Sequence, residues 1–316
     1  MYFCFMKLGV VMDPIESINL KKDSTLAMML EAQSREHQLF YMTPDSLYIN
    51  ERGAFAIAKT LHVKNDPIGW FDFKEEKQIK LSELDVILMR QDPPFNSNYI
   101  YNTYVLESAE KEGVLVVNKP SSLRDCNEKV FATEFPECCT PFLVTSDPYL
   151  LKSFIDDHKD TVIKPLDGMG GSSIFRLRYS DPNLNVILET ITESFTTKVM
   201  IQTYIPEITD GDKRILLING NPMDAAVARV PAEGELRGNL AAGASAVARS
   251  LTEKDLWICE QVGPKLKDLG LVLVGLDIIG DYLTEINVTS PTCFREYESL
   301  CDIDVAHNFI EEVEGL

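Results

Sequence analysis

The chain has 316 residues, of which 45% are hydrophobic and 25% are charged, a composition typical of a soluble globular protein with a sizeable core. The chain has 30 Lys and Arg residues and 49 Asp and Glu residues, which gives a formal net charge of -19. This negative charge argues against nucleic acid or an anionic membrane as a partner. No apolar run approaches the roughly 18 residues of a membrane span, residues 1–5 lack the features of a signal peptide, and seven cysteines without a repeated spacing indicate reduced thiols, so we expect a cytoplasmic protein.

The first third of the chain predicts a parallel sheet with helices on its faces. Four short apolar strands are expected at Lys7–Met12, His37–Met42, Leu84–Met89 and Val114–Val117. A helix capped by Asp23 and Ser24 is expected at Thr25–Arg35. Ligands of such sheets bind beyond the carboxyl ends of the strands. The candidate ligand-binding residues at that rim are Asp13, Asn19, Arg90 and Asp92, each with a solvated loop group as the alternative.

The strand pattern ends near Lys119-Pro120, and we place a domain boundary there. The segment Ser122–Asp125 is expected to open a helix that carries Lys129.

A glycine-rich loop is predicted at Lys164–Gly171, between the strands Thr161–Lys164 and Ser172–Arg178. Its glycines let backbone amides approach an anion closely, and Lys164 at the strand end can reach a phosphate. A P-loop or a dinucleotide fingerprint would need a different glycine spacing that leads into a helix, and neither spacing is present. A plain hairpin loop is the alternative.

The next segment predicts strands at Met200–Ile205 and Ile215–Ile218, with a hairpin turn at Asn219-Gly220. After Ala225–Arg229 comes Val230–Ser245, which is rich in Gly and Ala and has little apolar bulk for packing. We expect a mobile lid there, carrying Arg237 over reacting anions, or otherwise a plain flexible loop.

The stretch Gly275–Pro291 predicts a buried strand, a turn at Gly280-Asp281 and a returning strand. Glu285 and Asn287 share one face of the returning strand because they are two residues apart. Asp277 is a carboxylate in an apolar run, which is costly to bury unless it is paired or bound to a metal. Oxygen ligands of this kind suit magnesium that carries phosphates. The alternative is a hairpin whose polar face is merely hydrated.

The register of this hairpin decides whether Asp277 belongs to the metal site. A two-residue turn in a regular ladder would set Asp277 opposite Thr284, on the wrong face from Glu285. One extra residue would set it opposite Glu285. We therefore predict either a longer loop or a bulge.

Several sequence strings together resemble the prokaryotic glutathione synthetases, a family of ATP-grasp ligases. These strings are MDPI (Met12–Ile15), DPPF (Asp92–Phe95), NKPSSLRDCNEK (Asn118–Lys129), KPLDGMGG (Lys164–Gly171), DGDKR (Asp210–Arg214), RGNLAAG (Arg237–Gly243) and TEINVTSPTC (Thr284–Cys293). They span nearly the whole chain.

The resemblance implies an α/β protein with a pre-ATP-grasp parallel-sheet domain, residues 1–122, followed by an ATP-grasp domain, residues 123–316. The second domain would have a nucleotide lobe, 123–205, and a metal and catalytic lobe, 206–316. The implied reaction joins glycine to γ-glutamylcysteine with ATP and gives glutathione, ADP and phosphate. The implied cofactor is magnesium, with manganese as a second possibility, and the family implies a homo-oligomer.

The resemblance also implies a role for each candidate site residue. Phosphate and nucleotide contacts fall to Lys129, Lys164, Gly168, Gly170, Gly171, Gln202, Thr203, Tyr204, Ile205 and Asp212. The metal ligands are Asp277, Glu285 and Asn287. The implied catalytic residues are Arg214, Arg229 and Arg237. The implied substrate-binding residues are Asp13, Asn19, Arg90, Asn239 and Ser290.

The chain departs from the family pattern in three places. Residues 1–5 precede the usual start, which makes Met6 an alternative initiator. Gln91 stands where a lysine is common, and Ala244–Arg249 replaces a more polar stretch at the end of the lid. Two other functions stay open at this point: another ATP-grasp carboxylate–amine ligase, and a nucleotide-binding regulator without turnover.

Overall fold

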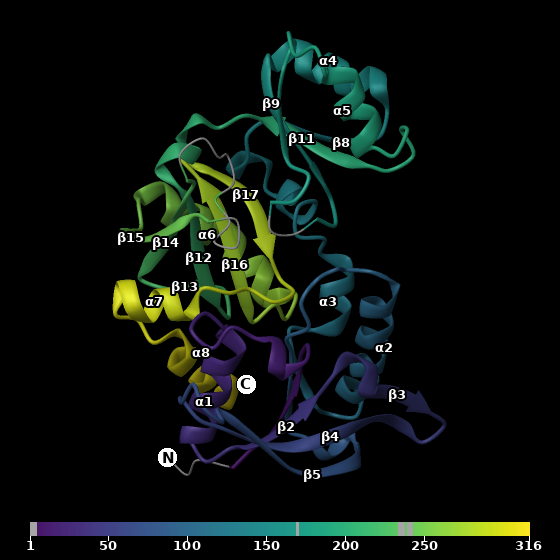
Figure 1. Ribbon diagram of the computed structural model, residues 1–316, viewed down its shortest axis with the longest axis vertical. Helices are drawn as coiled ribbons and strands as arrows, with labels where there is room; N and C mark the ends of the chain where they lie inside the picture. Colours follow the sequence, from purple (N-terminus) through teal and green to yellow (C-terminus); the bar gives the residue numbers. More distant parts are fainter. Residues whose placement is uncertain (1–4, 169–170, 233–237, 239–242) are drawn as a thin grey trace.

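The structure is a computed structural model that describes residues 5–168, 171–232, 238 and 243–316. Within these residues the strands form three sheets, of seven, four and six strands. Figure 1 shows the four-stranded sheet at one end of the molecule, the six-stranded sheet in the middle and the seven-stranded sheet at the other end. Among the described residues, no helix combines the length and the apolar character needed to cross a membrane.

The seven-stranded sheet comes from the first part of the chain. Its strands are β1 (Lys7–Val11), β2 (Gln38–Met42), β3 (Leu47–Asn50), β4 (Gly53–Val63), β5 (Phe71–Lys80), β6 (Val86–Met89) and β7 (Leu115–Val117). They lie in the order β3-β4-β2-β1-β6-β7, and β5 pairs with β4. The four predicted strands are the parallel neighbours β2, β1, β6 and β7, as expected. The antiparallel strands β3, β4 and β5 extend that core.

Three helices cover the two faces of this sheet. They are α1 (Ser24–Ser34), α2 (Ser97–Lys111) and α3 (Pro120–Asp125). Leu8 and Val10 of β1 pack with α1, while Val11 packs in the core on the side of α2 and α3. Alternate strand residues point to opposite faces, so both faces are buried. The predicted cap of α1 is confirmed, because the Asp23 carboxylate accepts a hydrogen bond from the backbone N–H of Leu26.

The prediction that a helix carries Lys129 was wrong. α3 ends at Asp125, and Lys129 lies in the turn that follows it. The cause is Asn127, whose side-chain oxygen accepts hydrogen bonds from the backbone N–H groups of Lys129 and Val130. An Asn side chain that bonds in this way competes with helical hydrogen bonding and favours a turn.

The four-stranded sheet forms a small separate lobe. Its strands are β8 (Phe142–Thr145), β9 (Asp160–Pro165), β10 (Phe175–Arg178) and β11 (Val199–Thr203), in the order β10-β9-β11-β8. All its pairs are antiparallel. The helices α4 (Pro148–His158) and α5 (Leu184–Ile191) belong to the same lobe (Figure 1). The predicted glycine-rich loop connects β9 to β10, at the edge of this sheet.

The six-stranded sheet is entirely antiparallel. Its strands are β12 (Asp212–Ile218), β13 (Asn221–Pro222), β14 (Ala225–Val230), β15 (Ser245–Ser250), β16 (Leu273–Ile279) and β17 (Tyr282–Asn287). They lie in the order β15-β14-β12-β16-β17, and β13 pairs with β12 across the predicted turn Asn219-Gly220. The predicted lid therefore leads from β14 into β15, and most of the stretch Ala244–Arg249 is strand.

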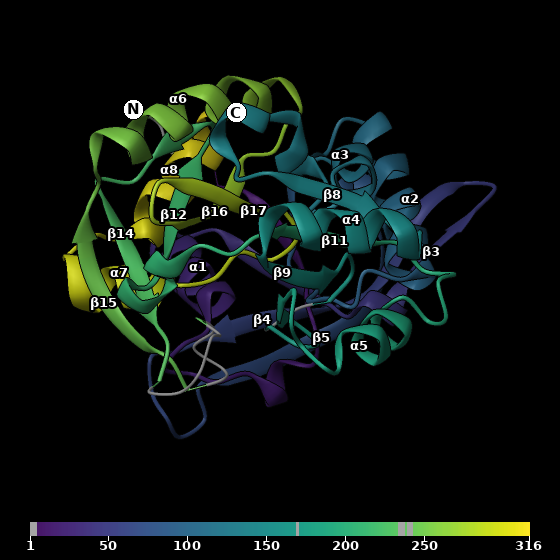
Figure 2. The same cartoon turned by 90° about the horizontal axis from the view of Figure 1, so that it is seen from above.

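Helices cover both faces of this sheet as well. They are α6 (Glu253–Asp268), α7 (Phe294–Cys301) and α8 (Val305–Gly315). α6 runs along one face, as Figure 2 shows from above. It packs there on Ile215 and Leu217. α7 and α8 pack on the other face, against Leu216 and Ile218. The remaining turns of helix are the 3-10 segments Ile15–Ser17, Pro44–Ser46, Leu81–Glu83, Phe131–Glu134, Pro136–Cys138 and Pro206–Asp210.

The apolar cores divide the molecule into two units. Two large clusters each contain side chains of both the seven-stranded and the six-stranded sheets. A third cluster contains only side chains of the small lobe, such as Leu151, Ile163 and Leu188. The first and last thirds of the chain therefore form one packed body, and the small lobe has a core of its own.

Candidate active site

A cavity of about 410 Å³ lies between the small lobe and the six-stranded sheet, and Asp92 and Pro93 extend it to the rim of the seven-stranded sheet. Most of the predicted site residues line it, namely Lys129, Lys164, Gly168, Gly171, Gln202, Thr203, Tyr204, Ile205, Asp212, Arg214, Arg229, Asp277, Glu285, Asn287 and Ser290. Gly170, Arg237 and Asn239 lie outside the described residues, as do residues 233–237 and 239–242 of the predicted lid.

The hairpin of β16 and β17 contains the predicted bulge. Ile279 pairs with Tyr282, so Gly280 and Asp281 alone form the turn. The register then shifts by one residue, and Thr284 is the residue without a partner across the ladder. The prediction of a longer loop or a bulge is confirmed in its second form.

Because of this bulge the three predicted metal ligands lie on one face. Asp277 pairs with Glu285, and Gly275 pairs with Asn287. Directly opposed residues of antiparallel strands project to the same side. The side-chain nitrogen of Asn287 donates to the carbonyl oxygen of Gly275 at 3.2 Å, which makes its oxygen Oδ1 the atom that can ligate a cation.

Two carboxylates and an amide are hard oxygen donors, which is the ligand set that magnesium takes from proteins. In the described part of the chain no group of three or more His, Cys, Asp and Glu residues could hold a metal ion. The predicted set is of a different kind, because one of its three donors is an amide. These residues fit a magnesium ion that takes its other ligands from phosphate oxygens and water.

Asp277 is held by two arginines. Its carboxylate accepts hydrogen bonds from Arg214 Nε at 2.6 Å and Nη2 at 3.2 Å, and its Oδ2 lies 2.9 Å from Arg229 Nη2. Burial alone would raise the pKa of Asp277, but the two guanidinium groups hold it below its ordinary value. Asp277 is therefore ionised, and it fixes both predicted catalytic arginines.

Asp212 lies on the other side of Arg229, whose Nη2 donates to its Oδ2. The second oxygen, Oδ1, is buried and has no hydrogen-bond partner among the described residues. Burial raises the pKa of Asp212 to about 7, against the lowering effect of Arg229. A buried acceptor without a partner at a cavity wall is a group that a ligand can satisfy.

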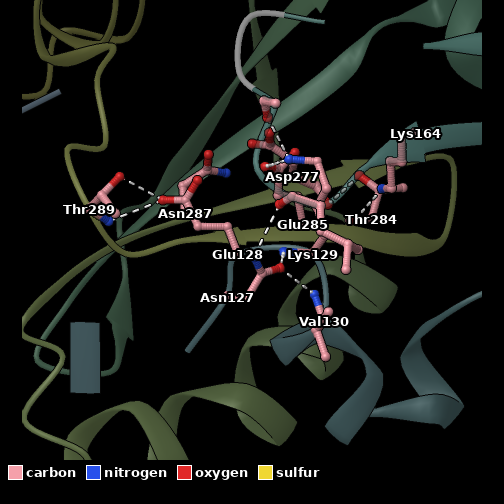
Figure 3. Close-up of polar contacts among 12 residues, drawn as sticks. Asn127, Glu128, Lys129, Val130, Lys164, Asp277, Thr284, Glu285, Asn287 and Thr289 are labelled. Atoms are coloured by element: carbon pink, nitrogen blue, oxygen red, sulfur yellow. Dashed lines mark hydrogen bonds and ion pairs between the residues drawn. The ribbon is translucent and has the colours of Figure 1, made fainter. Parts of the chain in front are cut away.

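The two predicted phosphate lysines reach from the small-lobe side of the cavity to β17. Lys129 Nζ donates to the carbonyl oxygen of Gly168 at 2.7 Å and to Glu285 Oε1 at 3.1 Å. Lys164 Nζ donates to the carbonyl oxygen of Thr284 at 2.9 Å (Figure 3). Burial lowers the pKa of Lys164, while the carboxylate of Glu285 opposes that effect. Both ammonium groups thus lie beside the predicted metal ligands.

Three of the predicted substrate residues do not line the cavity. Asp13 accepts a hydrogen bond from the backbone N–H of Asp92, and Asn19 accepts one from Lys21. Arg90 is buried and donates to the hydroxyl of Thr25 and to the carbonyl oxygen of Pro291. Asp13 and Arg90 thus hold two segments that do reach the cavity, the loop after β6 and the loop after β17.

Sequence reasoning missed several residues that line the cavity. Arg176 of β10 stacks over the ring of Tyr204 at 3.5 Å, and its guanidinium also binds Asp160. Glu128 accepts three hydrogen bonds from the segment after β17. Alternation along β10 could have indicated Arg176, but Glu128 gives no signal besides its place in the string NEK.

The only thiol among the described lining residues is that of Cys293, the N-cap residue before α7, whose backbone φ is +86°. Burial raises the pKa of this thiol, although Arg214 and Arg229 oppose the effect. A protonated thiol is a poor nucleophile.

Two family models match the chain over most of its length. Residues 6–124 match the N-terminal domain of prokaryotic glutathione synthetase, and residues 128–302 match its ATP-grasp domain. The glutathione synthetase of Pseudomonas putida is 57% identical over 309 residues, which cover 98% of each chain. That of Escherichia coli O157:H7 is 53% identical over 310 residues, again 98% of each.

The chain belongs to the prokaryotic glutathione synthetase family. The predicted enzyme class, an ATP-dependent ligase, and the function that the family implies, synthesis of glutathione, are confirmed with it. ATP use and dependence on a divalent metal follow from this family as well.

Solved structures support the fold alone. A D-cycloserine synthetase superposes with a TM-score of 0.68 at 12% identity, over 98% of this chain and 99% of that one. An ATP-grasp ligase bound to a minimal precursor gives a TM-score of 0.64 at 18% identity, with the same coverage. The predicted fold class, a parallel-rich α/β domain followed by an ATP-grasp domain, is confirmed.

Proposed function

We propose that this ligase of the glutathione synthetase family joins glycine to γ-glutamylcysteine with ATP, and that the reaction passes through an acyl phosphate. The observation that supports it best is the convergence in one cavity of four cationic side chains with three oxygen donors on one face of a hairpin. The cations are Lys129, Lys164, Arg214 and Arg229, and the donors are Asp277, Glu285 and Asn287.

The chemistry requires charge neutralisation more than a protein nucleophile. A carboxylate is a poor acyl donor, so its oxygen first attacks the γ-phosphorus of ATP, and ADP leaves. The amine of glycine then attacks the acyl carbon, phosphate leaves with the bonding electrons, and the amine loses a proton to solvent. Charge develops on phosphoryl and carbonyl oxygens in both steps, where fixed cations stabilise it.

Arg214 and Arg229 would bind the reacting carboxyl and phosphoryl groups. Their orientation is set before substrate arrives, because Asp277 and Asp212 hold both guanidinium groups. Donors fixed in this way need no reorganisation when charge develops. Lys129 and Lys164 would bind ATP phosphates, together with the backbone amides of the loop at Gly168, Gly170 and Gly171.

Asp277, Glu285 and Asn287 would hold magnesium, with manganese as the alternative metal. Bound there, the ion supplies further neutralisation of phosphate charge. Adenine and ribose would lie along Gln202, Thr203, Tyr204 and Ile205, with the unpartnered oxygen of Asp212 as an acceptor for a ribose hydroxyl.

The remaining expectations form part of the same proposal. Ser290 would contact the peptide substrate, and Asp13, Asn19 and Arg90 would support the loops around it, while Arg237 and Asn239 would act from the lid. We propose that residues 1–122 form the pre-ATP-grasp domain and residues 123–316 the ATP-grasp domain, with a nucleotide lobe at 123–205 and a metal and catalytic lobe at 206–316. We also propose a cytoplasmic homo-oligomer that binds no nucleic acid and no membrane.

ADP release is the experiment that tests the function. We expect release that requires γ-glutamylcysteine and becomes catalytic only when glycine is present, with glutathione formed in equal amount. Catalytic turnover with other amino acid acceptors at a similar rate would favour a different carboxylate–amine ligase. No ADP release under any condition, with ATP bound, would favour a regulator.

A further inference from the structure

β17 carries Glu285 and Asn287, and it is an edge strand of the six-stranded sheet. One edge pairs with β16, while the described residues place no strand along the other. Backbone N–H and C=O groups on such an edge need partners when they are buried. In this protein the partners come from outside the sheet.

Glu128 supplies most of them. Its backbone oxygen accepts a hydrogen bond from the N–H of Ile286 at 2.9 Å. Its carboxylate oxygen Oε1 accepts from the N–H of Val288 at 3.0 Å. The same oxygen accepts from the N–H and the hydroxyl of Thr289 at 3.1 and 2.8 Å (Figure 3). The residue before Asn287 and the two residues after it are therefore bonded to one residue.

Two other residues complete this edge. Lys164 donates to the carbonyl oxygen of Thr284, and Asn118 donates from Nδ2 to the carbonyl oxygen of Val288 at 2.7 Å. Each of them contacts only one side of Asn287. Glu128 alone bonds to the backbone on both sides of Asn287, so it fixes the stretch of backbone from which the Asn287 side chain projects.

The three bonds to Oε1 come from two backbone N–H groups and a hydroxyl, all of them neutral. Neutral donors need an acceptor at the right place and do not need a negative charge. Burial, and after it repulsion from the nearby carboxylate of Glu285, raise the pKa of Glu128 and so disfavour its charge, while the hydrogen bonds from Thr289 oppose that effect. The hydrogen bonds therefore require the position of the acceptor oxygen, while its surroundings disfavour the negative charge. Substitutions can test the two properties separately.

We infer that Glu128 is a positioning residue of the ligase, which replaces a missing strand at the outer edge of β17 and so holds Glu285 and Asn287 in place. The inference rests on the proposed function for its kinetic test. Its structural test, the protection of the β17 edge from hydrogen exchange, does not depend on any substrate.

Two variants separate acceptor geometry from charge. Glu128→Gln keeps an oxygen acceptor at the same reach without the charge, whereas Glu128→Asp keeps the charge and withdraws the acceptor by one methylene. We expect Glu128→Asp to lower kcat by about 100-fold and to change KM for γ-glutamylcysteine little. The reason is that a displacement of site residues by about 1 Å can cost that much in rate. Glu128→Gln should lose about threefold or less.

Hydrogen exchange gives the second measurement. The amides of Val288 and Thr289 should exchange faster in Glu128→Asp and at nearly the wild-type rate in Glu128→Gln. If Glu128→Asp does not fold, Thr289→Val removes one of the three donors and should still speed exchange at these amides. Glu134→Gln, which changes an exposed partner of Lys265, is the control and should change neither measurement.

An opposite order of activity, with Glu128→Asp active and Glu128→Gln inactive, would show that the charge acts directly and would overturn the inference. Equal loss in both variants, or exchange unchanged in Glu128→Asp, would do the same. A wild-type protein that releases no ADP with γ-glutamylcysteine and glycine would instead contradict the proposed function. The hydrogen-exchange data would still test whether Glu128 holds the edge of β17.

Discussion

Arg214, Arg229, Asp277 and Asp212 form a chain of alternating buried charges along one wall of the cavity. Removing one member of such a set leaves an uncompensated buried charge, which costs about 3–5 kcal/mol. Variants of these four residues would therefore lose stability together with activity. Glu285 and Asn287 give cleaner tests, since among the described residues Glu285 has one ion-pair partner and Asn287 donates one long hydrogen bond.

We expect Glu285→Gln and Asn287→Ala to lose most turnover, by about 100-fold or more, while the melting temperature changes little. The reason is that these side chains would hold magnesium and not the apolar core. Steady-state kinetics over a range of magnesium concentrations, together with thermal unfolding, checks this. Loss of stability in proportion to activity would count against the metal role.

At the residue scale, the sequence could indicate which side chains matter but not which of them touch. The spacing of Glu285 and Asn287 predicts their common face, and a buried carboxylate at Asp277 predicts a paired charge. The position of Lys129 was wrong because one Asn side chain ends the helix before it. Glu128 was missed because its three donors lie about 160 residues further along the chain.

At the scale of elements, the contact between α6 and the turn after β12 is unusually close. A Cβ atom on Gly263 would overlap the carbonyl oxygen of Gly220, and one on Gly220 would lie 2.6 Å from the carbonyl oxygen of Gly263. The two glycines let the helix and the turn meet backbone to backbone.

We expect Gly263→Ala to destabilise the protein, although Ala favours a helix by about 1 kcal/mol over Gly. Overpacking against backbone costs about 1–3 kcal/mol and outweighs that gain. Urea unfolding measures the difference. Gly315→Ala in α8, where a Cβ meets no atom within 4 Å, is the matched control and should be neutral or slightly stabilising. A stabilised Gly263→Ala would mean that α6 can move away from the turn.

A second element contact joins α1 to α8 through charged groups. Glu31 accepts a hydrogen bond from Arg35 at 2.8 Å and lies 3.0 Å from His307, while Arg35 reaches Glu314 at 2.6 Å. Burial favours the neutral form of Glu31, but Arg35 and His307 hold its pKa below the ordinary 4.5. The unfolded chain therefore binds this proton more readily than the folded one.

A lowered folded-state pKa stabilises the protein above the unfolded pKa, and the contribution disappears as the pH falls through the folded value. We expect the wild type to lose more unfolding free energy than Glu31→Gln between about pH 6 and pH 3. Urea unfolding at each pH measures it. Glu51→Gln, at a side chain that is 79% exposed, should follow the wild type. Parallel curves for all three proteins would refute the stabilising role of Glu31.

Apolar runs and turn residues were enough to predict β1, β2, β6 and β7, and the register argument predicted the bulge in the β16–β17 hairpin. β4 and β5 were missed for a physical reason. β5 has the sequence FDFKEEKQIK, whose charged residues give no apolar run, and pairing with β4 along most of its length holds it in the sheet. Tertiary pairing of that kind overrides local propensity.

At the scale of the whole molecule, the small lobe has a separate core, whereas the two larger sheets share theirs. A unit with its own core can open or move without disrupting the rest. The cavity lies between the small lobe and the larger body, so movement of the lobe would change access to it.

We expect Leu188→Ala, in the core of the small lobe, to cost that lobe about 2–5 kcal/mol. Hydrogen exchange should then become faster in β8, β9 and β11 but not in β1 or β12. Leu39→Ala, in the core shared by the two larger sheets, is the contrast and should speed exchange in both of those sheets. Equal effects of Leu188→Ala on all three sheets would contradict the division into two units.

The shared core also has a consequence for synthesis on the ribosome. α1 packs against α8, which lies about 270 residues further along the chain. Synthesis adds about 5–20 residues per second, so the apolar surface of the first sheet stays uncovered for on the order of 15–50 s before α8 is made. The small lobe can close its core much sooner. The nascent chain would thus present a folded lobe beside an open sheet, a surface suited to chaperone binding until α8 emerges.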